Sequence, residues 1–434
     1  PRFHVIIDTD AAIDDMRSIS MFLSGNDFRV LAIIGSQGTI SSQSSYYKIL
    51  SLLENFNHQG IPVGMGYNLD SKLPPWSNFA ENILWGKEIN AKTEQIPDAL
   101  DLLNKVTEKY RYKITLVALG TLNTYATWLK ENPDLISKID RIIWYNNSDL
   151  KRGFNYSVDP KSYEFIIKLG VPLHIVSNTR NDLICNNEYL NILQNANSVY
   201  AKQIVDVHKQ PLVVEKIKEN HLKLWDDLVP LYLIHPLLFD VQTEDKIVYA
   251  PINSTIPQCF IYNSILELIV SAMLTEDKVF AGFPVDKNIY KPEYAKILDK
   301  NISEYGIKEW KAVALTNEIH GHTGIYSIIG AKMGVRACEY YNVGVNNLRV
   351  VSFAGNIPPL SCFNDGIQIS TGATIGQGLI KISEELIDIP TAIFEFNGQR
   401  IKMSLDEEIS NQMKNEISFG VKNYGLLSDR YWIY

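Results

Sequence analysis

Short, continuously apolar runs alternate with amphipathic helical periods through the first two thirds of the chain. Apolar runs without polar alternation are typical of parallel strands that are covered on both faces. Strands are expected at 3–8, 30–35, 61–66, 114–120, 141–145 and 172–177. Helical periods lie between them, for example at 14–24 and 46–56. This βαβ alternation predicts an α/β fold built on an open, mostly parallel sheet.

The chain is long enough for more than one domain. A length of 434 residues exceeds what one ordinary hydrophobic core supports. Near residue 305 the βαβ pattern gives way to a histidine-containing stretch and then a glycine-rich region. The sequence therefore predicts one domain over residues 1–305 and a smaller α+β domain over residues 306–434.

Composition excludes several classes of partner. The net charge is −8 and no block rich in Lys and Arg occurs, so we expect no nucleic-acid partner. No apolar stretch reaches transmembrane length, so no membrane partner is expected. The four cysteines form no C-x-x-C pair, which argues against a disulfide framework or zinc ribbon. Because the chain starts with Pro1, an export signal or a tag is expected to have been removed, and the compartment stays open.

Residues 8–15 read DTDAAIDD and follow the first expected strand. Ligands of open α/β sheets bind outside the carboxyl ends of the strands. The polar stretches 35–38, 120–124 and 146–149 also follow expected strands. We therefore expect these loops to converge on one pocket.

Four aspartates in eight residues need a physical explanation. One aspartate in the first turn of a helix is an ordinary N-terminal preference, but four close carboxylates repel one another. A divalent cation removes the repulsion, and oxygen ligands favour Ca²⁺ or Mg²⁺. An EF-hand loop starting at Asp8 would need glycine where Ile13 stands. The segment therefore predicts a metal site of another kind.

The same segment resembles the signature of the inosine–uridine nucleoside hydrolase family. Three further stretches resemble family landmarks in the same order: ALGTLNTYA at 118–126, GFNYSVDP at 153–160 and LWDDLVPLYLIHPLLF at 224–239. The resemblance covers roughly residues 3–305. It implies Ca²⁺-dependent hydrolysis of the N-glycosidic bond of ribonucleosides to free base and ribose.

The resemblance also implies residue roles. Three carboxylates and one backbone carbonyl would hold Ca²⁺: Asp10, Asp15, Asp226 and Asn123. Asp10 would in addition act as the general base toward the attacking water. Asp14 and Asn155 would bind ribose hydroxyls, and Asp8 would support the site from behind.

Two tryptophans point to the base. Trp225 stands where many family members have a histidine that protonates the leaving base, and Trp85 stands at a second base-side position. The purine-specific branch of the family is similar, with the base held between aromatic rings. The alternative is that each tryptophan is an ordinary core residue. The pattern favours purine ribonucleosides as small-molecule substrates.

Two departures from the family pattern leave alternatives open. Gly153 stands where the family has a glutamate that helps to bind the 5′-hydroxyl, and Ser36 replaces an asparagine. Lys151 or Arg152 could meet a charged 5′ group, or could be a solvated basic pair. The rival functions are a non-catalytic nucleoside-binding or sensory protein, and a hydrolase of another N-riboside such as nicotinamide riboside.

The second domain resembles the E-subunit family of formylmethanofuran dehydrogenase. The stretches HGHTGIYSIIGAKMG at 320–334 and CFNDGIQISTGATIGQG at 362–378 carry the resemblance, although two of the family's cysteines are missing. His320, His322 and Cys362 could bind a transition metal such as Zn²⁺, or could be polar pocket or core residues. The domain could also form a dimer interface, and a homo-oligomer is expected.

Overall fold

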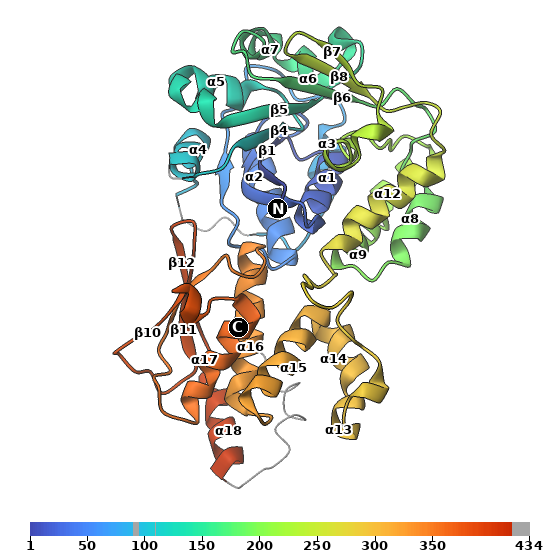
Figure 1. The fold of residues 1–434 in the computed structure, drawn as a ribbon. Helices are drawn as coiled ribbons and strands as arrows, with labels where there is room; N and C mark the ends of the chain where they lie inside the picture. Colours follow the sequence, from blue (N-terminus) through green and yellow to red (C-terminus); the bar gives the residue numbers. More distant parts are fainter. Residues whose placement is uncertain (90–94, 109, 419–434) are drawn as a thin grey trace. The chain divides into compact units, whose positions relative to one another are not determined.

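The computed structural model describes residues 1–89, 95–108 and 110–418, which form two compact units (Figure 1). The border between the units lies between Ala272 and Met273. This border precedes the change of sequence pattern near residue 305. Leu298 packs against Trp310 in one small hydrophobic cluster, so the segment before residue 305 joins the second unit. The expected limits of the two domains stay a prediction.

The first unit is built on an eight-stranded sheet in the order β3-β2-β1-β4-β5-β6-β8-β7. All neighbouring strands are parallel except β7 and β8, which are antiparallel. The strands are β1 (Phe3–Thr9), β2 (Phe28–Gly35), β3 (Val63–Met65), β4 (Ile114–Ala118), β5 (Ile139–Tyr145), β6 (Leu173–Ser177), β7 (Gln242–Glu244) and β8 (Ile247–Pro251). The six expected strands and the mostly parallel α/β class are confirmed.

Helices connect these strands. They are α1 (Ile13–Ser24), α2 (Ser42–Asn55), α3 (Ser77–Glu81), α4 (Ala99–Glu108), α5 (Asn123–Glu131), α6 (Phe154–Val158), α7 (Pro160–Ile166), α8 (Asn187–Gln194), α9 (Val199–His208), α10 (Pro211–Lys218), α11 (Leu228–Ile234) and α12 (Gln258–Ser271). Short 3₁₀ turns span η1 (Pro133–Lys138), η2 (Leu150–Arg152) and η3 (Pro236–Leu238). No helix of the described residues is long and apolar enough to cross a membrane.

Helix α1 lies in the interior of the first unit. Every residue of α1 is buried, because α9, α11 and α12 pack around it. Helices α8, α9 and α12 lie together in the first unit (Figure 1). A hydrophobic cluster packs α4 and α5 against β1, β2, β4 and β5. Burial of both faces accounts for the continuously apolar strand sequences.

The carboxyl ends of the central strands meet at one edge of the sheet. Asp8 pairs with Ile34 of β2 and with Ala118 of β4, so the residues that follow each strand leave from the same edge. The chain then turns at Ala11, whose φ is 55°, and enters α1. This register sets the acidic segment beside the loops that follow β2 and β4.

The second unit combines a small sheet with helices, as the expected α+β class requires. Its sheet has the order β10-β9-β11-β12, and α16 packs against α15 and α17. The strands are β9 (Arg349–Ser352), β10 (Ile380–Ile382), β11 (Thr391–Phe396) and β12 (Gln399–Ser404). The helices are α13 (Pro292–Ala295), α14 (Leu298–Tyr305), α15 (Ile307–His320), α16 (Ile325–Tyr341), α17 (Phe363–Thr371) and α18 (Glu407–Ser418), with 3₁₀ turns η4 (Lys287–Ile289), η5 (Leu360–Cys362) and η6 (Ile375–Gln377). Met333, Phe363 and Phe394 lie in its core.

Candidate active site

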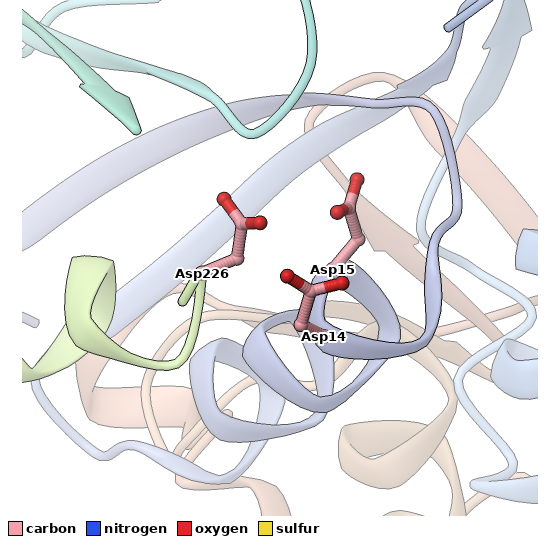
Figure 2. Close-up of side chains that lie close together, drawn as sticks. All are labelled: Asp14, Asp15 and Asp226. Atoms are coloured by element: carbon pink, nitrogen blue, oxygen red, sulfur yellow. The ribbon is translucent and has the colours of Figure 1, made fainter. Parts of the chain in front are cut away.

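Three carboxylates meet at the carboxyl edge of the first sheet. Asp14 and Asp15 occupy the first turn of α1, and Asp226 lies just before α11. One oxygen of each lies within 4.8 Å of the others, and Figure 2 shows the side chains converging from α1 and from the segment before α11. All three residues are buried. The fold thus joins the acidic segment to a residue more than 200 positions away.

Local hydrogen bonds fix the Asp15 end of this group. The Thr9 hydroxyl donates to Asp15 Oδ2 at 2.6 Å, and the backbone N–H of Asp10 approaches the same oxygen at 3.2 Å. The backbone N–H of Ala11 donates to Thr9 Oγ1 at 3.0 Å. These contacts hold the turn between β1 and α1 in one conformation.

Asp226 carries an oxygen that lacks a partner. Its Oδ1 atom is buried, and no hydrogen bond reaches it from the part of the chain that the structure describes. An unpaired buried carboxylate oxygen costs several kcal/mol unless a positive charge or donor compensates it. The Asp226 carboxylate faces the group that contains Asp14 and Asp15 (Figure 2). Oxygen atoms alone make up this group, which fits a hard cation such as Ca²⁺ or Mg²⁺.

Asp10 and Asp8 lie beside the three carboxylates. Asp10 Oδ2 accepts a hydrogen bond from the Thr39 backbone N–H at 2.9 Å, and Asp8 Oδ1 accepts one from Ser36 Oγ at 2.7 Å. A Cβ atom at Gly38 would lie 2.1 Å from Asp10 Oδ2, so only glycine leaves room for this carboxylate. Asp10 is not one of the three that converge in the described residues, and its roles as ligand and base stay predictions.

Burial dominates the electrostatics of the site. It raises the pKa of Asp8 to about 7 and that of Asp10 to about 6. Burial, followed by repulsion from neighbouring aspartates, also raises the pKa of Asp15 and of Asp226 well above the usual range. Burial thus disfavours the charged form of each of these carboxyl groups, and a bound cation would offset that cost.

The two expected asparagines lie at the starts of α5 and α6, the helices that follow β4 and β5. Asn155 is buried, and its Nδ2 donates to the carbonyls of Leu119 at 2.8 Å and Tyr145 at 3.0 Å. Asn123 donates its side-chain N–H to Asp159 Oδ2 at 2.8 Å, and the role of its backbone carbonyl as a ligand stays a prediction. Both residues lie at the edge of the sheet that carries the acidic segment.

The two tryptophans differ in exposure. Trp225 directly precedes Asp226 and is 40% exposed. Trp85 is 1% exposed, and its ring lies edge-on to His208 with 6.4 Å between centroids. Trp225 is thus accessible to a ligand. A base could stack on Trp85 only if the residues that bury Trp85 moved.

Sequence reasoning did not identify two charged residues behind the site. Arg17 of α1 and Asp227 form an ion pair in which both side chains are 0% exposed. An arginine inside the otherwise uncharged stretch that follows Asp15 was the available signal, because a buried guanidinium requires an acidic partner.

In the second unit, the expected metal residues are only partly brought together. His320 Nδ1 lies 2.9 Å from Asp365 Oδ2, and the rings of His320 and His322 lie 4.3 Å apart. Within the described ranges, Asp14, Asp15 and Asp226 are the single set of three or more such residues with converging ligand atoms, so Cys362 completes no second set. The transition-metal site stays a prediction.

Comparison with known proteins agrees with this architecture. Residues 5–279 match the family described as inosine-uridine preferring nucleoside hydrolase. Residues 319–422 match the FmdE family, whose description is "FmdE, Molybdenum formylmethanofuran dehydrogenase operon". The first match covers more than half of the chain, so the chain belongs to the nucleoside hydrolase family, whose members are N-ribohydrolases. The resemblances of both parts are thereby confirmed.

Individual relatives differ in the nucleosides that their names give. Uridine nucleosidase 1 of Arabidopsis thaliana is 24% identical over 249 residues, which are 54% of this chain and 72% of that protein. The pyrimidine-specific ribonucleoside hydrolase RihA of a Shewanella species is 26% identical over 264 residues, covering 55% and 80%. The structure of a purine-preferring ribonucleoside hydrolase from Gardnerella vaginalis aligns with a TM-score of 0.52 at 17% identity, covering 62% of this chain and 98% of that one.

Proposed function

We propose that the first unit hydrolyses the N-glycosidic bond of purine ribonucleosides with the help of Ca²⁺. The observation that carries the proposal is the convergence of Asp14, Asp15 and Asp226, with the buried Oδ1 atom of Asp226 unpartnered in the described residues. Such a group is costly without a cation and suits one with oxygen ligands. Membership of the nucleoside hydrolase family supports the reaction class.

Four residues are proposed to hold the ion: Asp10, Asp15, Asp226 and, through its backbone carbonyl, Asn123. When bound, Ca²⁺ would supply positive charge that orients water and the ribose hydroxyls. Asp10 is proposed as the base that takes a proton from the water that attacks the anomeric carbon. Its hydrogen bond from the Thr39 N–H fixes the orientation of the carboxylate. The C–N bond breaks as the C–O bond forms, and its electron pair stays on the leaving base. The base takes up a proton from solvent, and the proton on Asp10 returns to solvent.

The sugar would be held by hydroxyl contacts. Asp14 is proposed to accept a hydrogen bond from a ribose hydroxyl, because its carboxylate faces the same space as those of Asp15 and Asp226 (Figure 2). Asn155 spends its two N–H groups on the Leu119 and Tyr145 carbonyls, so its amide oxygen is the atom available to a second hydroxyl. Nearby carboxylates also favour the positive charge that develops on the ribose ring.

The base would contact Trp225. Its exposed indole adjoins Asp226, so a purine stacked on it would lie next to the sugar site. Gly153 and Ser36 depart from the family pattern. One relative is named for uridine and another for pyrimidine ribonucleosides. Purine preference therefore has to be measured against uridine and cytidine.

Release of free base from a nucleoside panel tests the proposal. Inosine, guanosine, uridine, cytidine and nicotinamide riboside are each incubated with the full chain, in CaCl₂ and in EDTA. We expect faster cleavage of inosine and guanosine than of the pyrimidine nucleosides, and loss of turnover in EDTA that CaCl₂ restores. An Asp10→Ala variant that melts normally and has no turnover would support the role of Asp10.

Each rival has its own outcome. Binding of nucleosides without any turnover in CaCl₂ would favour a non-catalytic sensor and overturn the hydrolase proposal. Cleavage of nicotinamide riboside alone would move the substrate to another N-riboside. Turnover that persists in EDTA would overturn the calcium requirement.

A further inference from the structure

A buried ion pair links helix α1, which carries Asp14 and Asp15, to the segment that carries Asp226. Arg17 Nε donates to Asp227 Oδ1 at 2.8 Å, and Arg17 Nη2 donates to Asp227 Oδ2 at 2.9 Å. This is the two-pronged geometry in which arginine holds a carboxylate most rigidly. Both side chains are fully buried. The pair therefore fixes the distance and the orientation between α1 and the segment that precedes α11.

Two further donors of Arg17 are also engaged. Nη2 donates to the Lys223 carbonyl at 2.9 Å, and Nη1 lies 3.2 Å from His208 Nε2. His208 Nδ1 lies 2.6 Å from the Ile204 carbonyl and donates to it, so Nε2 is the acceptor for Arg17. Burial, and then the charge of Arg17, lower the pKa of His208 to about 3, which keeps the ring neutral. Arg17 thus contacts the 223–227 segment at two points and α9 at a third.

The ion pair between Arg17 and Asp227 lies next to two of the clustered carboxylates. Arg17 follows Asp15 by two residues on α1, and Asp227 directly follows Asp226. Asp15 and Asp226 repel each other when both are charged, and the contact between Arg17 and Asp227 opposes their separation. A buried ion pair adds little to stability compared with an apolar pair of the same size, whereas its directional contacts fix geometry.

We propose that Arg17 and Asp227 are positioning residues that set Asp226 against Asp14 and Asp15, and so determine the affinity of the site for Ca²⁺. The inference rests on the proposed function only in taking Ca²⁺ as the ion. It assigns no contact with substrate to either residue. The pair acts through the backbone that joins Asp227 to Asp226.

Calcium affinity separates positioning from folding. The double variant Arg17→Met/Asp227→Leu removes both charges together and leaves no unpaired buried ion. Arg17→Lys keeps one charge but loses the two-pronged contact. The matched control is Lys332→Met/Glu309→Leu, which removes another buried ion pair, in the second unit. The dissociation constant for Ca²⁺ is measured by isothermal titration calorimetry, and melting is followed in EDTA.

We expect the double variant to bind Ca²⁺ about 10- to 100-fold more weakly than the wild type, with a smaller loss for Arg17→Lys. The control variant should keep the wild-type constant. The melting temperatures of the variants in EDTA should not rank in the same order as their calcium affinities. If the ion pair were purely structural, the variants would differ in melting temperature and not in the calcium affinity of the folded protein.

The outcomes distinguish the two proposals. Failure of the wild type to bind Ca²⁺ would overturn the proposed calcium site and this inference with it. Wild-type affinity in a folded double variant would overturn the inference alone. Should the double variant not fold, Arg17→Lys decides, since unchanged affinity there would equally refute the role of the ion pair.

Discussion

A Cβ atom added at Gly153 would lie 1.9 Å from Asn146 Oδ1. Asn146 is buried, its Oδ1 accepts the Tyr156 backbone N–H at 3.2 Å, and its Nδ2 donates to the Leu150 carbonyl at 3.1 Å. Asn146 therefore occupies the space that any larger side chain at position 153 would need. The glutamate that the family pattern has at this position is excluded by packing, which accounts for the departure seen in the sequence.

Gly153→Ala should lower the free energy of unfolding by about 1–3 kcal/mol, because Asn146 must leave its hydrogen bonds. Urea denaturation measures the loss. Gly282→Ala is the control, since a Cβ there meets no atom within 4 Å and we expect no more than about 0.5 kcal/mol of change. Adding Asn146→Ala should make Gly153→Ala nearly neutral, and an undiminished loss in that background would contradict the clash.

Asp226→Asn should have opposite effects on activity and on stability without calcium. Turnover in CaCl₂ should fall by about 100-fold or more, because a charged ligand is lost. The EDTA-treated protein should become more stable by about 1 kcal/mol, because the amide needs neither a buried charge nor a bound proton. Asp27→Asn, at an exposed position, should change neither quantity. A variant that loses activity and EDTA stability together would instead indicate that Asp226 is structural.

Trp225→Ala and Trp85→Ala form a matched pair of aromatic deletions. Trp225 is partly exposed, so its loss should raise KM for inosine about 10-fold, with a smaller effect on uridine and little change in Tm. Trp85 is buried against His208, so its loss should cost about 3–5 kcal/mol of stability. Equal losses on purine and pyrimidine substrates in Trp225→Ala would argue that this ring only packs.

The effect of calcium on stability should depend on pH. Burial raises the pKa of Asp8 to about 7 and that of Asp10 to about 6, so without calcium the folded protein binds more protons than the unfolded chain between about pH 4 and 7. Its stability therefore falls as pH rises through that window. Calcium requires the deprotonated carboxylates, so CaCl₂ should raise Tm more at pH 8 than at pH 5.

Melting curves in CaCl₂ and in EDTA, taken at each pH, check this prediction. His208, whose pKa is lowered to about 3, acts in the opposite direction by making the protein less stable as pH falls below about 6.5. Comparing the two conditions at the same pH cancels that contribution. A calcium-induced shift of Tm that is the same at pH 5 and pH 8 would contradict proton release from the site.

Zinc analysis tests the second expected metal site. If His320, His322 and Cys362 bind zinc, then His322→Ala and Cys362→Ser should each lose the metal that the wild type retains. His320 already contacts Asp365, so it is the residue of the three with an orienting partner. Elemental analysis of the purified proteins gives the answer, and equal zinc content in all three proteins would remove the site.

Local sequence was sufficient for the main strands and for the acidic turn. The sequences of β1, β2, β4 and β5 are largely apolar. Such sequences are typical of strands whose two faces are both covered. The edge strand β7 and its neighbour β8 were not predicted. β7 is three exposed residues, and its pairing with β8 depends on a partner rather than on its own composition.

The sequence by itself determined that aspartates would follow the first strand, because hydrophobic periodicity is a local property. It also indicated that strand ends would share one edge, because strands joined by helical crossovers run parallel. Only the tertiary structure decided which carboxylates meet. It joined Asp14 and Asp15 to Asp226, covered Trp85, and buried Arg17 against Asp227. The physical reason is that burial and charge pairing depend on side chains from segments far apart in the chain, and no local pattern records which of them come into contact.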